Sequence, residues 1–230
     1  RLLGERHDLP LSIALHLVPG VLIVALLVAM LLNSKIRGKT ALRTICFFPY
    51  LTSMVSVATV WNLILAPSGP LNQLLRMVGI SNPPGWLLDQ NWALYSVIIV
   101  AIWKNFGYYM IILLAGLQGI PKYLYESAEI DGATKRQCFT NITVPMLSPT
   151  IFLCLVTIII AAFQEFDLIN ILTEGGPGRA TNVLVFRIYT EGFVNVKMGY
   201  ASAIAYTLFA IIMVITLIQF VLQKKWVNYD

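Results

Sequence analysis

Charge is what this sequence has least of. Of its 230 residues, 12% are charged and 58% are hydrophobic, and the mean hydropathy is +0.77. A soluble domain has roughly 25% charged and about 45–50% apolar residues, so this chain carries half the usual charge on a more apolar body. These proportions exclude a soluble monomer. At about 20 apolar residues for each membrane crossing, the chain has room for five or six membrane helices.

Histidine and cysteine are also scarce. The only two histidines are His7 and His16, so neither a histidine-based zinc site nor a Ser/His/Asp triad can be assembled. The three cysteines, Cys46, Cys138 and Cys154, are odd in number and lack metal or disulfide spacing, which predicts free thiols. We therefore expect no metal site and no catalytic residue in this chain.

Alternation of apolar and polar residues over about ten positions, which marks a membrane β-barrel, is absent from the sequence. Long apolar stretches with at most an isolated charge predict membrane helices instead. We expect an all-α polytopic helix bundle, with residues 1–230 forming a single transmembrane domain. The five predicted membrane helices lie at about residues 9–32, 44–66, 92–120, 145–172 and 200–223.

The sixteen Lys and Arg residues are scattered between the apolar runs rather than gathered on one face, which argues against a nucleic-acid partner. Nine of them lie in one set of alternate loops and the C-terminal end, and six lie in the other set. Because positive charge is enriched on the cytoplasmic side of a membrane, the C-terminus and the loop at 119–144 are predicted to be cytoplasmic. The loops at about 67–91 and 173–199 and the first eight residues are then outside.

One cytoplasmic segment has clear signals for two short helices. Pro121 suits the first turn of a helix, and Gly132 suits its end. Thr134 and Gln137 have capping-box spacing, so a second helix is predicted to begin there. A short helix at about 122–132 therefore lies in water between two membrane helices. A helix of that length is marginal unless it packs against something.

This segment also resembles a known motif. Glu126-Ser127-Ala128-Glu129-Ile130-Asp131-Gly132-Ala133, followed by Phe139, Ile142 and Pro145, resembles the EAA motif of ABC importer permeases, with Ser127 where Ala is usual. Further segments resemble the maltose-type branch of that family, which carries sugars and glycerol phosphate: Leu114–Gln118 with Ile120-Pro121, Phe166-Asp167, Thr173 with Gly175–Pro177, and Gly199 with Ala201–Ala203.

The resemblance implies that the short helix is a coupling helix, which sits in a cleft of a cytoplasmic ATPase subunit. In the family, the residue matching Glu126 forms an ion pair with that subunit, and the residue matching Gly132 makes a tight turn. The residue types agree, since small side chains permit close approach and a carboxylate offers a charged anchor. The predicted coupling residues are Glu126, Ser127, Ala128, Asp131, Gly132 and Ala133.

The resemblance also implies partners and a location. A second, similar permease subunit would form a heterodimer with this chain in a bacterial or archaeal cytoplasmic membrane. Two cytoplasmic ATPase subunits would bind ATP and Mg²⁺, so this chain would hold no cofactor and hydrolyse nothing. An extracytoplasmic binding protein would deliver a sugar-like solute to the two outer loops, and alternating access would move it across.

Family members often have six or more crossings, one more than this sequence predicts. The chain opens on Arg1 rather than Met, and no secretory signal pattern follows. We therefore expect a fragment whose natural start is missing. A lost first helix would enter from the cytoplasm and give six crossings in the full chain.

Polar residues inside the predicted helices are candidates for the substrate path. Lys104 lies near the middle of its helix, where an unpaired charge costs at least ~2.5 kcal/mol, so it must face a cavity or a partner. We hypothesise that it meets Glu165, Asp167 or a sugar hydroxyl, and both structural ion pairing and substrate contact remain open. The candidate residues are Lys104, Asn105, Tyr108, Tyr109, Gln164, Glu165, Asp167 and Asn170.

Two details of this path are left open by the pattern. The angles of the four polar residues at 164–170 spread too widely for one helix face, so either that end unwinds or only some of them point inward. Thr52, Ser53, Ser56 and Thr59 share an arc that either lines a cavity or packs closely between helices. Hydroxyls, amides and aromatic faces suit a carbohydrate.

Two other classes of protein are alternatives. An ion-coupled secondary transporter of a small polar solute would need intramembrane carboxylates, for which Glu165 and Asp167 are the only candidates. An intramembrane hydrolase would need a base beside its nucleophile, and the four later helices contain no histidine.

Overall fold

The computed structural model describes residues 9–34 and 37–228, and within these residues every regular element is a helix. The predicted all-α membrane bundle is therefore confirmed. Five helical runs in the described part are long and apolar enough to cross a membrane: Ile13–Asn33, Met54–Met77, Ala93–Gly119, Lys135–Leu172 and Met198–Gln223. Arg1, the first eight residues and Lys35, which entered the charge argument above, lie outside the described residues.

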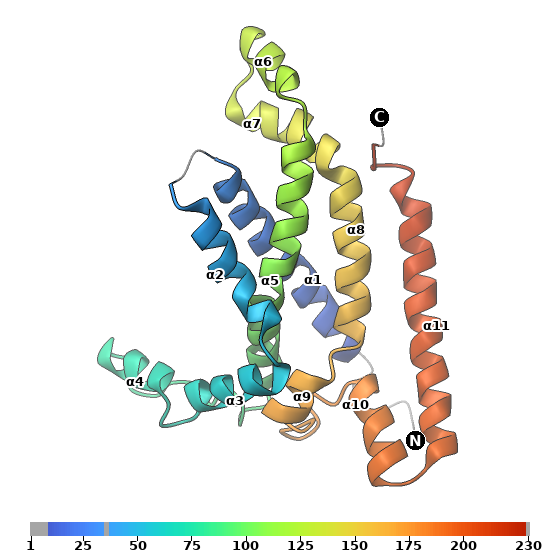
Figure 1. The fold of residues 1–230 in the computed structure, drawn as a ribbon. Coiled ribbons are helices and arrows are strands. Elements are labelled where there is room, and N and C mark those ends of the chain that lie inside the picture. The colour runs from blue at the N-terminus through green and yellow to red at the C-terminus, as the bar shows by residue number, and fades with distance from the viewer. Residues whose placement is uncertain (1–8, 35–36, 229–230) are drawn as a thin grey trace.

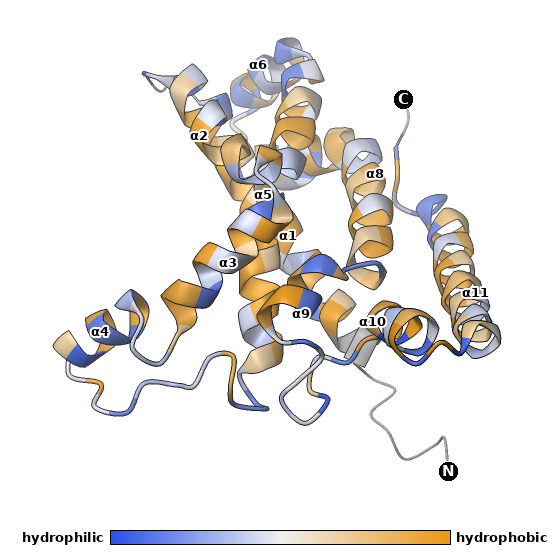
Figure 2. Cartoon of the chain, turned by 60° about the horizontal axis from the view of Figure 1, so that its bottom comes forward, coloured by the Kyte–Doolittle hydropathy of each residue, from blue (hydrophilic) through white to orange (hydrophobic). Residues whose placement is uncertain are grey.

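Three helices form the centre of the bundle. They are α1 (Leu9–Asn33), α5 (Ala93–Gly119) and α8 (Val144–Phe163), and each packs on the other two (Figure 1). Small residues such as Ala25 and Ala29 on α1 are completely buried, which lets the helix backbones approach closely. Figure 2 shows apolar residues along these helices and hydrophilic residues in α6.

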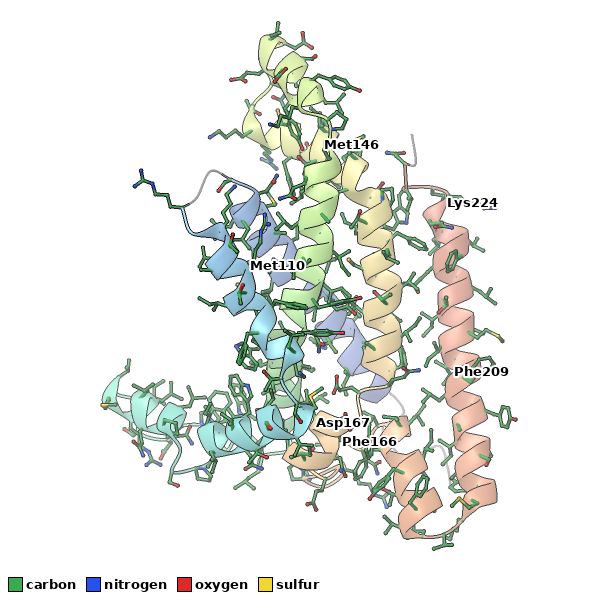
Figure 3. The ribbon with its side chains drawn as sticks, in the orientation of Figure 1. Met110, Met146, Phe166, Asp167, Phe209 and Lys224 are labelled. Carbon is green, nitrogen blue, oxygen red and sulfur yellow. The ribbon has the colours of Figure 1, made fainter. Side chains whose placement is uncertain are left out.

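α11 (Met198–Gln223) lies at the edge of the bundle beside α8 (Figure 1). Most of its apolar side chains are exposed; Phe209, which is labelled in Figure 3, is 62% exposed. Ala201, Ile204 and Leu208 are its buried apolar residues. The rest of α11 therefore presents an apolar surface that lipid or another membrane protein must cover.

The structure corrects the predicted continuous helix at 44–66. Two helices occupy this stretch, α2 (Lys39–Leu51) and α3 (Met54–Leu65), and the chain between them is extended at Thr52 and Ser53. α2 packs on α5, whereas α3 and the following α4 (Pro70–Met77) extend sideways (Figure 1). Pro49 within α2 lacks an N–H group and weakens the last turn, which favours an end at this point.

The predicted helix at 145–172 is also interrupted. α8 ends at Phe163, the chain is non-helical from Gln164 to Phe166, and α9 (Asp167–Leu172) follows. The alternative in which this end unwinds is therefore the one observed. α9 packs on α3, so the two interruptions belong to one region of the molecule.

The remaining short elements lie at the two ends of the bundle. α6 (Lys122–Ile130), α7 (Lys135–Cys138) and a π-helical segment η1 (Phe139–Thr143) connect α5 to α8 at the upper end in Figure 1. α10 (Leu184–Tyr189) and a second π-helical segment η2 (Thr190–Val194) precede α11 at the opposite end. Lys224, after the end of α11, lies at the same end as Met146 in α8 (Figure 3).

Candidate functional site

The predicted coupling helix is present as α6, which runs from Lys122 to Ile130 after Pro121 at its N-cap position. Its end is closed by its own backbone: the amide of Gly132 donates to the carbonyl of Glu129 (3.1 Å), and the amide of Ala133 donates to that of Ala128 (2.8 Å). This pair of bonds is a Schellman motif, which satisfies carbonyls at a helix end.

Gly132 has a φ of +77° in this motif, a conformation that glycine adopts readily and other residues adopt at a cost. A Cβ added to Gly132 would meet no atom within 4 Å, so the space around it is open. Within this chain, glycine is therefore required by the backbone conformation and not by crowding. This observation refines the tight-turn role that the motif implies.

One side of α6 is fixed to the rest of the chain. Leu124 and Tyr125 pack against the hydrophobic core, and the Tyr125 hydroxyl makes a 2.9 Å hydrogen bond with the hydroxyl of Thr143 in η1. The six predicted coupling residues lie largely outward: Glu126, Ser127, Asp131 and Gly132 are exposed, and Ala128 and Ala133 are half-buried. Ile130, an apolar side chain, is 86% exposed.

The capping box predicted at the next helix is present. The Thr134 hydroxyl accepts a hydrogen bond from the amide of Gln137, and the Gln137 side chain accepts one from the amide of Thr134. α7, η1 and α8 then follow without a break in helical structure. After the turn that ends α6, a capped and continuous helical connection therefore leads into the membrane helix α8.

Lys104 in α5 has a partner that the sequence argument did not consider. It is 5% exposed, and its ammonium group donates to three carbonyl oxygens at the end of α2, those of Pro49 (3.0 Å), Tyr50 (3.3 Å) and Thr52 (2.8 Å). Three donors thus meet three acceptors. Backbone carbonyls are a known way to accommodate an intramembrane cation.

The hypothesised ion pair is therefore not what the structure shows. Among residues 9–34 and 37–228, Lys104 forms no ion pair with Glu165 or Asp167. Glu165 is near enough to interact electrostatically with Lys104 but makes no direct contact with it. The reason is that the carbonyls at the end of α2 lie closer to the ammonium than either carboxylate does.

An aromatic cluster surrounds this point. The ring of Tyr50 stacks on that of Tyr108 at a centroid distance of 4.6 Å. The ring of Phe47 also stacks on that of Tyr50, at a centroid distance of 5.7 Å. Tyr50 is 38% exposed and Tyr108 is half-buried, whereas Tyr109 is 6% exposed and belongs to the core. Sequence reasoning missed Tyr50 and Phe47, although both lie within the last two turns before the helix break.

The other predicted path residues divide by exposure. Gln164 and Asp167 are exposed, and Glu165 and Asn170 are half-buried, around the interruption between α8 and α9. Asp167 and the adjacent Phe166 are labelled at this interruption in Figure 3. Asn105 is half-buried and donates to the Ala101 carbonyl of its own helix (2.9 Å). The structure thus places Tyr108 against the end of α2, leaves the Asn105 amide bonded to its own helix, and gathers the remaining four around the interruption before α9.

The two loops that are predicted to lie outside meet in a cavity of about 360 Å³. The loop after α9 is held in shape by Thr181, which is fully buried and bonds to the Thr173 hydroxyl (2.7 Å) and the Gly176 carbonyl (2.8 Å). The loop before α5 is held by a hydrogen bond from the Trp86 indole to Asn72 (2.7 Å). Polar and turn-forming residues from both sides line the cavity: Asn62, Pro67, Gly85, Thr173, Glu174 and Gly176.

Comparison with known proteins gives a consistent result. Residues 11–228 match the family described as "Binding-protein-dependent transport system inner membrane component". The sn-glycerol-3-phosphate transport system permease protein UgpA of Brucella abortus is 38% identical over 228 residues, which are 97% of this chain and 77% of that protein. A probable ABC transporter permease protein of Pyrococcus horikoshii is 38% identical over 90% of this chain and 72% of its own length.

Solved structures show the same relationship. A chain from a bacterial ABC transporter involved in the import of the acidic polysaccharide alginate superposes with a TM-score of 0.85 at 27% identity, covering 99% of this chain and 82% of that chain. The alginate transporter in complex with an alginate pentasaccharide-bound periplasmic protein gives 0.84 at 28% identity, covering 97% and 80%. None of these relatives supports the ion-coupled alternative. With an exposed short helix between two helices of an all-helical membrane bundle, this chain belongs to the binding-protein-dependent inner membrane components, the permease subunits of ABC importers.

Proposed function

We propose that α6 is the docking helix for a separate cytoplasmic ATPase subunit and that this chain translocates a sugar or sugar-like solute by alternating access. The observation that carries the proposal is the division of α6 into two sides. Leu124 and Tyr125 fix one side to the bundle, whereas Glu126 and Ile130 lie in solvent. An exposed apolar residue beside a carboxylate is suited to a protein partner.

ATP binding would close two partner ATPase subunits on each other and displace α6. Because α6 is bonded to η1 through Tyr125 and Thr143, and η1 continues into α8, the displacement would reach the membrane helices. Binding and hydrolysis of ATP would thereby shift the populations of inward-facing and outward-facing states. ATP and Mg²⁺ would be held by the partners, and this chain would supply no catalytic group.

The end of the bundle that carries α6 would face the cytoplasm. The start of α2, α7 and the end of α11 lie at this end (Figure 1), and each carries basic residues, which favour the cytoplasmic side. The C-terminus would therefore be cytoplasmic as well.

A solute with hydroxyl groups fits the polar and aromatic residues of the interior. The relatives are named for sn-glycerol-3-phosphate and for alginate, both of which carry hydroxyl groups. The partly exposed ring of Tyr50, stacked on Tyr108, would offer an apolar face, and Asn105 and Asp167 would offer polar contacts. Gln164, Glu165 and Asn170 would extend the path toward the outer end, while Lys104 and Tyr109 would support its wall.

An extracytoplasmic binding protein would dock where the outer loops meet. The 360 Å³ cavity between them is bounded by loops that internal hydrogen bonds hold in shape, so a side chain projecting from the partner could enter it. A second, similar permease subunit, together with lipid, would cover the exposed apolar faces of α3 and α11.

The proposal is tested by reconstitution. The chain, expressed with its genomic neighbours, should co-purify with an ATPase subunit, and vesicles containing the complex should take up solute only with ATP and a solute-loaded binding protein. Uptake that follows an ion gradient without ATP would contradict the proposal and favour a secondary transporter. Purification of the permease without any ATPase would contradict the docking role. So would an α6 that stays accessible to protease in a complex that contains the ATPase.

A further inference from the structure

The end of α2 is an unusual helix terminus because it lies inside the bundle. The last carbonyl groups of a helix have no partner within the helix and must be satisfied by water, by a capping residue or by another group. At this end, the Thr52 amide returns to the Pro49 carbonyl (3.3 Å). The Lys104 ammonium, from a different helix, also donates to the Pro49 carbonyl and to the carbonyls of Tyr50 and Thr52. The cap of α2 is thus supplied from more than fifty residues away.

The charge of Lys104 is balanced by this arrangement. A buried cation is costly unless charge or dipoles compensate it. The C-terminal end of a helix carries a partial negative charge of roughly half an elementary charge, and three carbonyl oxygens point at the ammonium. Removal of the ammonium would take a donor from all three carbonyls in a largely buried place, and only the Pro49 carbonyl would keep a backbone partner, the Thr52 amide.

Further contacts fix α2 to α5 on the same side. At Gly107, the next turn of α5, an added Cβ would overlap the carbonyl of Cys46, so the two helix backbones touch there. The stacked rings of Tyr50 and Tyr108 add a third contact. α2 and α5 therefore form one packed unit up to the helix break.

Beyond the break the packing partner changes. Thr52 and Ser53 are extended, and α3 packs on α9, with Val57 and Ala58 buried. Lys104 donates to the Thr52 carbonyl (2.8 Å), which lies just before the packing partner changes. Thr52 and Ser53 thus connect α2 to α3, and Lys104 holds the first of these two residues through its carbonyl.

We propose that Lys104 is a positioning residue for transport, not a substrate ligand: its ammonium pins the end of α2 to α5 and makes Thr52–Ser53 the hinge on which α3 and α9 move against the α2–α5 unit. This inference rests on the proposed function, since it assigns the hinge a place in the alternating-access cycle. Without the Lys104 ammonium, α3 would occupy a range of positions relative to α5, and ATP binding would no longer select one of these positions.

Spin-label distances in the complete reconstituted transporter test the hinge. Nitroxides are placed at the exposed positions Leu63 on α3 and Ile111 on α5, in a variant whose three cysteines are replaced by alanine and which retains transport. Lys104→Met should broaden the distance distribution in the nucleotide-free state, abolish its shift on ATP binding and lower the solute transported per ATP at least tenfold. Lys104→Arg, which keeps charge and donors, should restore much of both.

A matched control separates positioning from general stability. Ile158→Ala removes a buried side chain from α8, which packs on α1 and α5, and should lower the melting temperature with no change in the distances or in the transport per ATP. Unchanged distances and transport in Lys104→Met would overturn the inference, as would changes that Ile158→Ala reproduces. Absence of ATP-driven transport in the wild type would instead refute the proposed function, while the nucleotide-free distances would still decide whether Lys104 pins the hinge.

Discussion

Two helix ends in this molecule are closed in opposite ways. α6 ends in its own Schellman motif, with Gly132 at positive φ and open space around it. α2 ends against α5, with Lys104 as its cap and Gly107 in contact with its backbone. A self-contained end leaves the outer surface of a helix free for a partner, whereas an end capped by another helix fixes the two together. The first suits a docking element and the second suits a pivot.

The largest effect on stability is expected where α2 and α5 touch. Gly107→Ala places a methyl group on the Cys46 carbonyl and should destabilise the permease by about 2–3 kcal/mol, because backbone atoms cannot move aside easily. Gly119→Ala, at the end of the same helix with no atom within 4 Å of the new methyl, should be neutral or stabilising by up to about 1 kcal/mol. Thermal unfolding of the purified complex measures both. Equal stability of the two variants would refute the contact.

The next effect concerns function at the self-contained end. Glu126→Lys reverses the charge of the proposed anchor, and loss of a paired charge at an interface costs about 2–5 kcal/mol, so uptake should fall at least about 30-fold. Gly132→Val forces a β-branched residue to positive φ, at a cost of at least about 1–2 kcal/mol, and should also abolish coupling. Membrane insertion should persist in both.

The control for these two variants is Asn141→Lys, which adds a positive charge at an exposed position of the same end. It should transport normally. Vesicle uptake and solute-stimulated ATPase activity are the readouts. Normal uptake by both Glu126→Lys and Gly132→Val would remove α6 from the coupling path.

A smaller effect is expected at the link from α6 to η1. Tyr125→Phe deletes the hydrogen bond to Thr143, which is worth about 1 kcal/mol, and should reduce the solute transported per ATP by a few fold while the ATPase still binds. Tyr123→Phe changes an exposed ring on the same helix and should leave this ratio unaltered. If the two variants behave alike, the Tyr125 hydroxyl has no part in transmission.

The smallest effect is expected at the start of α7. Thr134→Ala removes the capping box and should destabilise the first turn of α7 locally by about 1 kcal/mol. Hydrogen exchange at the Gln137 amide, which donates to the Thr134 hydroxyl, should quicken by about fivefold. The Thr140 hydroxyl instead donates to a carbonyl of the preceding turn. Thr140→Ala should therefore leave the exchange of the Gln137 amide unaltered.

The difference between the two helix ends also determines what could be predicted from sequence. Long apolar stretches gave the membrane helices, and the signals at Pro121, Gly132 and Thr134 placed α6 and α7, because each acts within a few residues. The break at Thr52–Ser53 and the partner of Lys104 were not foreseen. Every residue has a backbone carbonyl, so the sequence does not indicate which carbonyl will accept a hydrogen bond from a distant lysine. The available signal for an interruption was Pro49, with Thr52 and Ser53 three and four residues after it.

For the candidate path, sequence identified chemical types but not their surroundings. It marked Lys104 as an intramembrane cation that must face a cavity or a partner, and offered a carboxylate or a sugar hydroxyl. The structure shows three backbone carbonyls in that place. It grouped Tyr109 with Tyr108, although neighbouring residues on a helix point about 100° apart, and the structure places Tyr109 in the core. Tyr50 was missed because its role depends on stacking across helices.

The two interruptions, at Thr52–Ser53 and at Gln164–Phe166, have a consequence for hydration. Hydrocarbon tails cannot accept or donate hydrogen bonds, so irregular backbone at membrane depth is tolerated only in a wet vestibule or under cover of protein. Ser53 and Gln164 are both exposed in this chain, and α3 and α9 place the interruptions in one neighbourhood. Lipid is therefore kept away from these two interruptions, and the depth to which solvent reaches them is set by where α2 and α8 end.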